Sequence, residues 1–158
     1  MKTLLISMFA FFLLLLSGCT SPFSISFTME SIGNYRAGIT IDRNKNYSIR
    51  RQNIYLDRQS GVENISTAQG KISDKDYTAL KELIVQSRLF SMNDAYGFDE
   101  TKDHSNTSAL ENILYQITYS NGRRSKSITI RPNSGNAYPQ KFPELISFLS
   151  RYISEHIK

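Results

Sequence analysis

Alternation of apolar and polar residues recurs in five stretches of the chain and constrains its fold more than any other pattern. A period of two indicates half-buried β-strands, because successive side chains of a strand point to opposite faces of the sheet. The predicted strands cover residues 23–30, 35–41, 47–56, 113–119 and 127–130. Asn121-Gly122 between the last two is a strong hairpin signal, since both positions of a tight turn then accept positive φ. Gly33-Asn34 and the polar segment 42–46 predict turns between the first three strands.

Two helices follow from spacings of three and four between apolar residues. Ser73 is a suitable N-cap and Asp76 stands three residues later, which predicts a helix from there to about Arg88. Pro143 suits the first turn of a second helix near the end of the chain. The predicted apolar stripes are Tyr77, Leu80, Leu83, Ile84 and Ser87 in the first helix, and Leu145, Ile146, Leu149, Tyr152 and Ile153 in the second. Residues 57–69 and 93–108 are polar and predict surface loops.

The order of these elements indicates the fold class. Three strands, a helix, two strands and a helix show no sustained βαβ alternation, and the links between strands are short. An antiparallel sheet covered on one face is the natural packing for such an order. We therefore expect an α+β fold: a single two-layer domain over residues 23–158, with about five to six antiparallel strands and two helices on one face.

The N-terminal segment predicts export from the cytoplasm. Lys2 precedes an almost unbroken apolar run of thirteen residues, Leu4–Leu16, and Ser17-Gly18 ends it. A membrane-spanning helix needs about 20 apolar residues, so the run fits the apolar region of a signal peptide better, with an uncleaved anchor as the alternative. Cleavage before Cys19 would leave 158 − 18 = 140 residues, a length that suits one domain.

Leu16-Ser17-Gly18-Cys19 resembles the lipobox of bacterial lipoproteins. The resemblance implies a lipoprotein signal peptide over residues 1–18 and a Cys19 that is lipidated with fatty acids such as palmitate. Residues 19–22 would then form a short tether that spans about 13 Å. Thr20 after the cysteine resembles lipoproteins sorted to the outer membrane, which implies a lipid-anchored protein of the cell envelope that faces the periplasm.

Several segments of the remaining chain resemble an uncharacterised domain of small bacterial envelope lipoproteins. They are Tyr35–Ile41, Gly70–Asp76 at the start of a helix, Leu89-Phe90 followed by Tyr96, the hairpin through Asn121-Gly122, and Pro143-Glu144-Leu145. The resemblance implies the α+β fold and the envelope location. It carries over no catalytic residues.

The sequence offers little for catalysis. It contains no Gly-x-Ser-x-Gly elbow, no phosphate-binding loop and no His-Glu-x-x-His, and its one cysteine is Cys19. His104 and His156 are the only histidines. We therefore expect a protein that is not an enzyme and needs no cofactor, with a hydrolase as the least favoured of three hypotheses.

No metal site is predicted. Asp42, Asn44 and Asn46 stand at the spacing of the first ligands of a calcium loop, but Tyr47 and Asn53 occupy the positions of its glycine and final glutamate. The acids of residues 94–103 and His104 lack the ligand spacing of known metal motifs. A hairpin turn and a solvated acidic loop are the simpler interpretations.

Charge provides the remaining functional lead. Without Lys2 the chain holds 18 Lys and Arg against 14 Asp and Glu, a charge of +4. Two of the predicted hairpins carry basic residues, and the candidates for binding an anionic partner are Arg43, Lys45, Arg123 and Arg124. Charged strand edges that prevent aggregation are the alternative. The expected partner is an anionic lipid, peptidoglycan or an envelope protein, whereas nucleic acid is not expected in this compartment.

Two non-enzymatic functions therefore stay open. The first is a binding or accessory module of the envelope that uses its basic face. The second is an inhibitor or immunity lipoprotein that acts against a cell-wall enzyme or toxin through the loop over residues 94–108.

Overall fold

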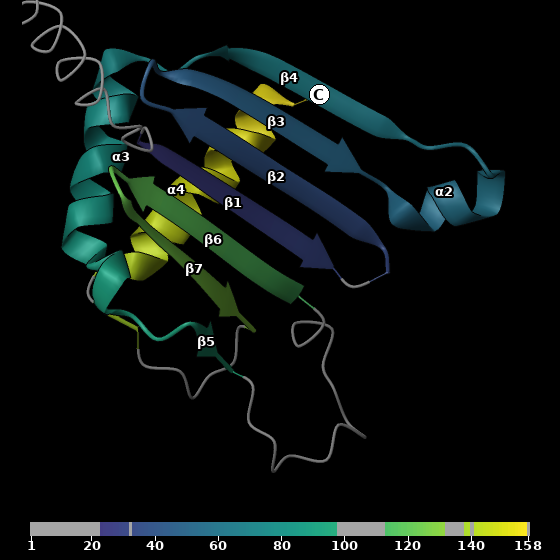
Figure 1. The fold of residues 1–158 in the computed structure, drawn as a ribbon. Helices are drawn as coiled ribbons and strands as arrows, with labels where there is room; N and C mark the ends of the chain where they lie inside the picture. The colour runs from purple at the N-terminus through teal and green to yellow at the C-terminus, as the bar shows by residue number, and fades with distance from the viewer. Residues whose placement is uncertain (1–22, 32, 98–112, 132–137, 140, 158) are drawn as a thin grey trace, which may run out of the picture.

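In the computed structural model, the described residues form one sheet of seven strands with two long helices on one side of it (Figure 1). The structure describes residues 23–31, 33–97, 113–131, 138–139 and 141–157. The strands are β1 (Ser24–Ser31), β2 (Tyr35–Asp42), β3 (Asn46–Gln52), β4 (Ile65–Lys71), β5 (Ala95–Tyr96), β6 (Ile113–Asn121) and β7 (Arg124–Ile130). The helices are α2 (Ile54–Ser60), α3 (Asp74–Ser87) and α4 (Phe142–His156), with a 3₁₀ turn at Leu89–Ser91.

The strand order across the sheet is β4-β3-β2-β1-β6-β7-β5. β1 therefore lies in the middle, paired antiparallel with β2 on one side and with β6 on the other. The short strand β5 pairs parallel with β7. The α+β class is confirmed, but the prediction of five to six antiparallel strands is wrong, because the sheet has seven strands and is mixed.

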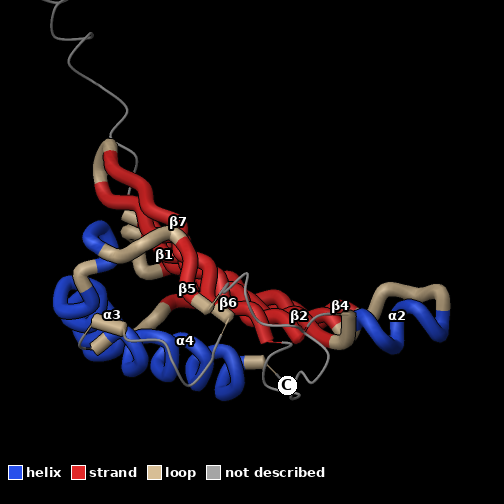
Figure 2. The backbone as a smooth tube through the Cα atoms, turned by 90° about the horizontal axis from the view of Figure 1, so that it is seen from below, coloured by secondary structure: helices blue, strands red, loops and turns tan. Residues whose placement is uncertain are grey.

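Helices α3 and α4 cover one face of the sheet, as Figure 2 shows in the view along its edge. The inward side chains of the strands, among them Phe27, Ile39 and Ile117, meet the apolar stripes of both helices in one buried cluster. Leu80 and Ile84 of α3 are buried there, together with Leu145, Leu149, Tyr152 and Ile153 of α4. Both helical stripes are thus confirmed as core.

The predicted N-cap of α3 is confirmed by two hydrogen bonds. The hydroxyl of Ser73 accepts a hydrogen bond from the backbone N–H of Asp76 at 3.1 Å and donates one to its carboxylate at 2.7 Å. The helix ends at Ser87, and the following residue, Arg88, has a φ of 49° that breaks the helical path. Pro143 lies in the first turn of α4, as predicted.

The chain between β3 and α3 differs from the prediction. The third strand was expected to reach Leu56 and a loop was expected over residues 57–69, but β3 ends at Gln52, and α2 and β4 follow. The side chain of Asn53 caps α2 by accepting from the backbone N–H of Leu56 at 3.1 Å. Gly61 ends α2 at a φ of 67°, a conformation that glycine adopts without steric cost. α2 is therefore a third helix, and it contains no buried residue.

The hairpin predicted at Asn121-Gly122 is present, shifted by one position. Asn121 pairs with Arg124, so the two turn residues are Gly122 and Arg123. Only Gly122 has a positive φ, 64°, which fits a type II′ turn with glycine at its first position.

Candidate functional site: the basic end of the sheet

The predicted basic residues of both hairpins lie at the same end of the sheet. The register places Ser24 of β1 between Asp42 of β2 and Ser120 of β6. The β2–β3 turn and the β6–β7 turn thus flank the start of β1, and Lys71 at the end of β4 pairs with Asn46 beside them. With strands about 4.8 Å apart, the two turns are separated by roughly 14 Å. We call this region, residues 43–45, 71 and 122–124 around Ser24, the basic end.

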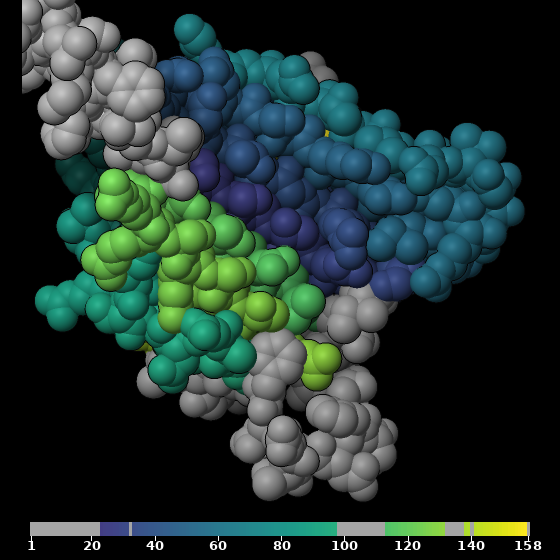
Figure 3. All heavy atoms as spheres, in the orientation of Figure 1, coloured from purple at the N-terminus to yellow at the C-terminus, as the bar shows by residue number. Residues whose placement is uncertain are grey.

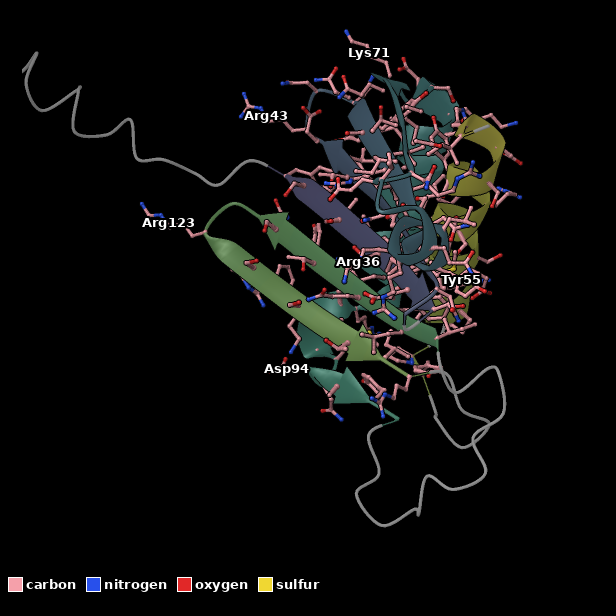
Figure 4. All side chains as sticks on the ribbon, turned by 90° about the vertical axis from the view of Figure 1, so that its right-hand side faces the viewer. Arg36, Arg43, Tyr55, Lys71, Asp94 and Arg123 are labelled. Atoms are coloured by element: carbon pink, nitrogen blue, oxygen red, sulfur yellow. The ribbon has the colours of Figure 1, made fainter. Side chains whose placement is uncertain are left out.

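Three of its cations extend away from the body of the protein. Figure 4 shows Arg43, Lys71 and Arg123 pointing outward from the basic end. All three are exposed, and none has an ion-pair partner among the residues that the structure describes. Their charge is therefore open to an external anion.

Lys45 and Arg124 have contacts of their own within the protein. The ammonium of Lys45 lies 2.7 Å from the carboxylate of Asp74, and this ion pair holds the pKa of Asp74 below its usual range. The backbone carbonyl of Lys45 also accepts from the N–H of Ile72 at 2.9 Å. Arg124 stacks its guanidinium over the ring of Phe90, 4.1 Å from the centroid. Of the four predicted residues, Arg43 and Arg123 are thus the ones with neither an ion pair nor a ring contact among the described residues.

The carboxylate of Asp42 holds the β2–β3 turn through hydrogen bonds. One carboxylate oxygen of Asp42 accepts from the backbone N–H of Asn44 at 2.8 Å and of Asn46 at 2.9 Å, and the other accepts from the side chain of Asn46. Partial burial raises the pKa of this carboxyl, but these hydrogen bonds and nearby Arg43 outweigh it and leave the pKa lowered. The calcium-like spacing in the sequence therefore corresponds to an Asx turn, as expected.

Of the predicted acidic loop, the structure describes only the start, up to residue 97. Asp94 forms an ion pair with Lys126 of β7, and Ala95-Tyr96 form β5. Asp99, Glu100, Asp103 and His104 lie outside the described residues. Within the part of the chain that is described, no three His, Cys, Asp or Glu side chains are close enough to hold a metal ion.

His156 belongs to an aromatic group at the end of α4. Its ring stacks on Tyr152 with centroids 4.0 Å apart and meets Tyr47 of β3 edge to face at 5.4 Å. One ring nitrogen, Nδ1, lies 2.9 Å from the backbone carbonyl of Tyr152. Burial raises the pKa of Tyr152 to about 12, so its hydroxyl stays neutral across the physiological range. These contacts give His156 a packing role.

Sequence reasoning missed a second prominent feature, the outcrop formed by α2 and the turn after it, residues 53–64. Tyr55, Leu56 and Val62 are 53%, 45% and 65% exposed there. Asp57 holds the outcrop in shape, since its carboxylate accepts from the side chain of Gln52 at 2.8 Å and from the backbone N–H of Asn64 at 2.5 Å. Asn53 as a cap and Gly61 as a terminator were the local signals that could have revealed α2.

Comparisons with known proteins add no identity to this geometry. No family model matches the chain. A search of the curated proteins finds no significant match. Among the described residues, no helix has the length and apolar character needed to cross a membrane.

Proposed function

We propose that this protein is a non-enzymatic envelope lipoprotein, tethered through Cys19, whose basic end lies against an anionic membrane surface. The observation that carries the proposal is the register around β1. Ser24, at the start of β1 and directly after the first described residue, lies between the two basic turns. A lipid on Cys19, only four residues before Phe23, would bring this end of the sheet to within about 13 Å of the anchor point.

Electrostatics then favour one orientation of the domain. Arg43, Lys71 and Arg123 would face anionic headgroups, and each basic residue near such a surface contributes about 1 kcal/mol. Loss of both Arg43 and Arg123 should therefore cost about 2 kcal/mol, which corresponds to roughly thirtyfold in the orientation equilibrium. The outcrop around α2 lies at the opposite end of the strands. Eight residues of β1 separate the two ends, a distance of about 24 Å.

Fluorescence quenching in lipid nanodiscs tests this orientation with the full-length lipidated protein. Because Cys19 is the only cysteine and would be acylated, Asn44→Cys and Gln59→Cys each supply one free thiol for a fluorophore. Asn44 lies in the basic end and Gln59 in α2, and both are exposed. A quencher on the lipid headgroups should quench the label at residue 44 strongly and the label at residue 59 weakly.

Control variants and conditions distinguish the effect of the basic charges on quenching from the effect of the lipid tether. Arg43→Gln with Arg123→Gln should reduce the difference between the two labels, whereas Arg58→Gln with Arg151→Gln, two exposed arginines elsewhere, should not. Nanodiscs of neutral lipid, or high salt, should also reduce it, because exposed charges are screened within about 10 Å at 0.1 M salt. Equal quenching at both positions in anionic nanodiscs at low salt would refute the orientation. Density-gradient fractionation tests the proposed outer-membrane location.

An inhibitor or immunity function is the second candidate, and the outcrop favours it. Three of the four large hydrophobic side chains that are exposed in the described residues, Tyr55, Leu56 and Val62, gather in this outcrop. Tyrosine is enriched among residues that dominate protein interfaces. A photo-crosslinking residue at position 56 should then capture one specific envelope enzyme, while the same residue at Gln86 on α3 should capture none. Identical products from both positions would argue against this candidate.

A further inference from the structure

The face of the sheet opposite to α3 and α4 is hydrophilic and open. Figure 3 looks onto this face, and its centre is formed by β1, β2 and β3. The register arranges the outward side chains in rows across the strands. One row runs Gln69, Ser48, Thr40, Ser26, Thr118, Ser127, and the next runs Thr67, Arg50, Gly38, Thr28, Gln116, Thr129. The first row consists of hydroxyl and amide groups alone, and the second adds one glycine and one arginine to such groups.

A hollow of about 280 Å³ lies in the middle of this face. Its lining includes the hydroxyls of Ser26, Thr28, Thr40 and Ser48, the side chains of Arg36, Arg50 and Gln52, and Gly38. The volume lies just below the usual range of small-molecule sites, about 300 to 1,000 Å³. The volume therefore limits any ligand of the hollow to a small one.

Gly38 lines the hollow and lies close to β1. A Cβ atom at this position would lie 3.2 Å from the backbone oxygen of Phe27 and 3.3 Å from Oγ1 of Thr28. Glycine in the interior of a strand weakens it, and often marks a place where a ligand or another backbone segment approaches closely. In this strand the glycine stands directly opposite Arg50.

The polar groups of the hollow offer more donors than acceptors. Glu30 accepts from Nε and Nη2 of Arg36 at 2.9 and 2.6 Å, which fixes the guanidinium and leaves Nη1 without a partner among the described residues. Arg50 is exposed and has no ion pair in the described part of the chain. The hydroxyl of Thr40 donates to that of Ser26 at 3.3 Å, and hydroxyls both donate and accept. Such a lining suits an anionic ligand that also carries hydroxyl groups.

We infer that the hollow around Gly38 binds an acidic saccharide unit, with its carboxylate or phosphate on Arg50 and Nη1 of Arg36 and its hydroxyls on Ser26, Thr40 and Ser48. No aromatic side chain of the described residues lines the hollow, so the sugar ring would be held by hydrogen bonds and charge. Arg50 and Arg36 lie on the face of the sheet rather than at the basic end, so this site does not depend on the proposed membrane orientation.

Nuclear magnetic resonance titration of the full-length protein in uncharged detergent micelles tests the inference. The probes are N-acetylmuramic acid for a carboxylated sugar, glucosamine 6-phosphate for a phosphorylated one, and N-acetylglucosamine as the neutral control. At least one acidic probe should shift the amide signals of Gly38 and Thr40, and the neutral sugar should not. A response to one acid alone identifies whether a carboxylated or a phosphorylated saccharide is the source of the anion.

Matched variants test whether the probe binds in the hollow. Arg50→Gln should weaken binding of the acidic probe about tenfold or more, because a charge-assisted hydrogen bond is lost. Arg58→Gln, an exposed arginine on α2 outside the hollow, should leave the affinity unchanged, and Thr40→Val tests the hydroxyl with little change in volume. Absence of shifts with both acids, equal shifts with the neutral sugar, or equal effects of Arg50→Gln and Arg58→Gln would overturn the inference.

Discussion

Replacing Leu149 by Ala should lower the free energy of unfolding by about 3 kcal/mol or more. Leu149 is fully buried within the cluster that joins α4 to the sheet. The change removes three carbon atoms, and at about 0.8 kcal/mol for each buried methylene the transfer term alone is about 2.4 kcal/mol. A cavity adds to this cost, so that substitutions of this kind span about 2.7 to 5 kcal/mol. The loss is large against a total stability of about 5 to 15 kcal/mol.

Urea denaturation followed by circular dichroism measures this loss as a lower midpoint at an unchanged slope. Val85→Ala is the matched control, since Val85 lies on α3 and is 73% exposed. Its free energy of unfolding should stay within about 0.5 kcal/mol of the original. If Leu149→Ala and Val85→Ala had the same effect, the burial of the α4 stripe and the reasoning built on it would be wrong.

Three further predictions concern other parts of the chain. Cys19→Ala should abolish incorporation of radiolabelled palmitate and leave the signal segment uncleaved, and retained label would end the lipoprotein proposal. Ser87→Ala should leave stability unchanged or raise it by about 1 kcal/mol in a thermal melt, because the hydroxyl of Ser87 is buried and has no hydrogen-bond partner among the described residues; a clear loss would reveal a partner. The backbone N–H of Asn64 and the side chain of Gln52 lower the pKa of Asp57, so the carboxylate stabilises the outcrop above about pH 4, and this support is lost as the pH falls through the lowered value. The amide chemical shifts of Asn64 and α2 should follow that titration before the rest of the protein responds.

The elements that the sequence predicted correctly are those in which local residue preferences and tertiary packing favour the same structure. The cap at Ser73, the proline at the start of α4 and the glycine of the β6–β7 turn each act through neighbouring residues, and the buried stripes of α3 and α4 repeat at the helical period. At these positions the local sequence therefore favours the same conformation that the tertiary fold requires.

β4 could not be predicted in this way. It is an edge strand without a single buried residue, so alternation of apolar and polar side chains is absent, and pairing with β3 alone makes it a strand. α2 likewise buries nothing, and its only signals are its caps.

The basic end could be predicted only in part, because its two turns come together through pairing of distant strands. The sequence identified Arg43 and Arg123 as members of two basic hairpins, but their proximity depends on β1 pairing with β6, which lies more than 80 residues further along the chain. No local pattern encodes that pairing. The ion pair of Lys45 with Asp74 has a similar origin, because it joins a turn to a helix that the tertiary fold brings together.

Among the described residues, β4 has a strand partner on one side only, and this edge has a consequence for self-association. Two copies that joined these edges by antiparallel pairing would be related by a two-fold axis perpendicular to the sheet, so that their basic ends would point in opposite directions. If two chains are tethered at Cys19 in the same leaflet as we propose, both basic ends would face that leaflet and the two chains would not form this pair. Membrane attachment would thus protect an exposed edge from the pairing to which such edges are prone, and the protein released from its lipid should dimerise or aggregate through β4 more readily than the anchored form.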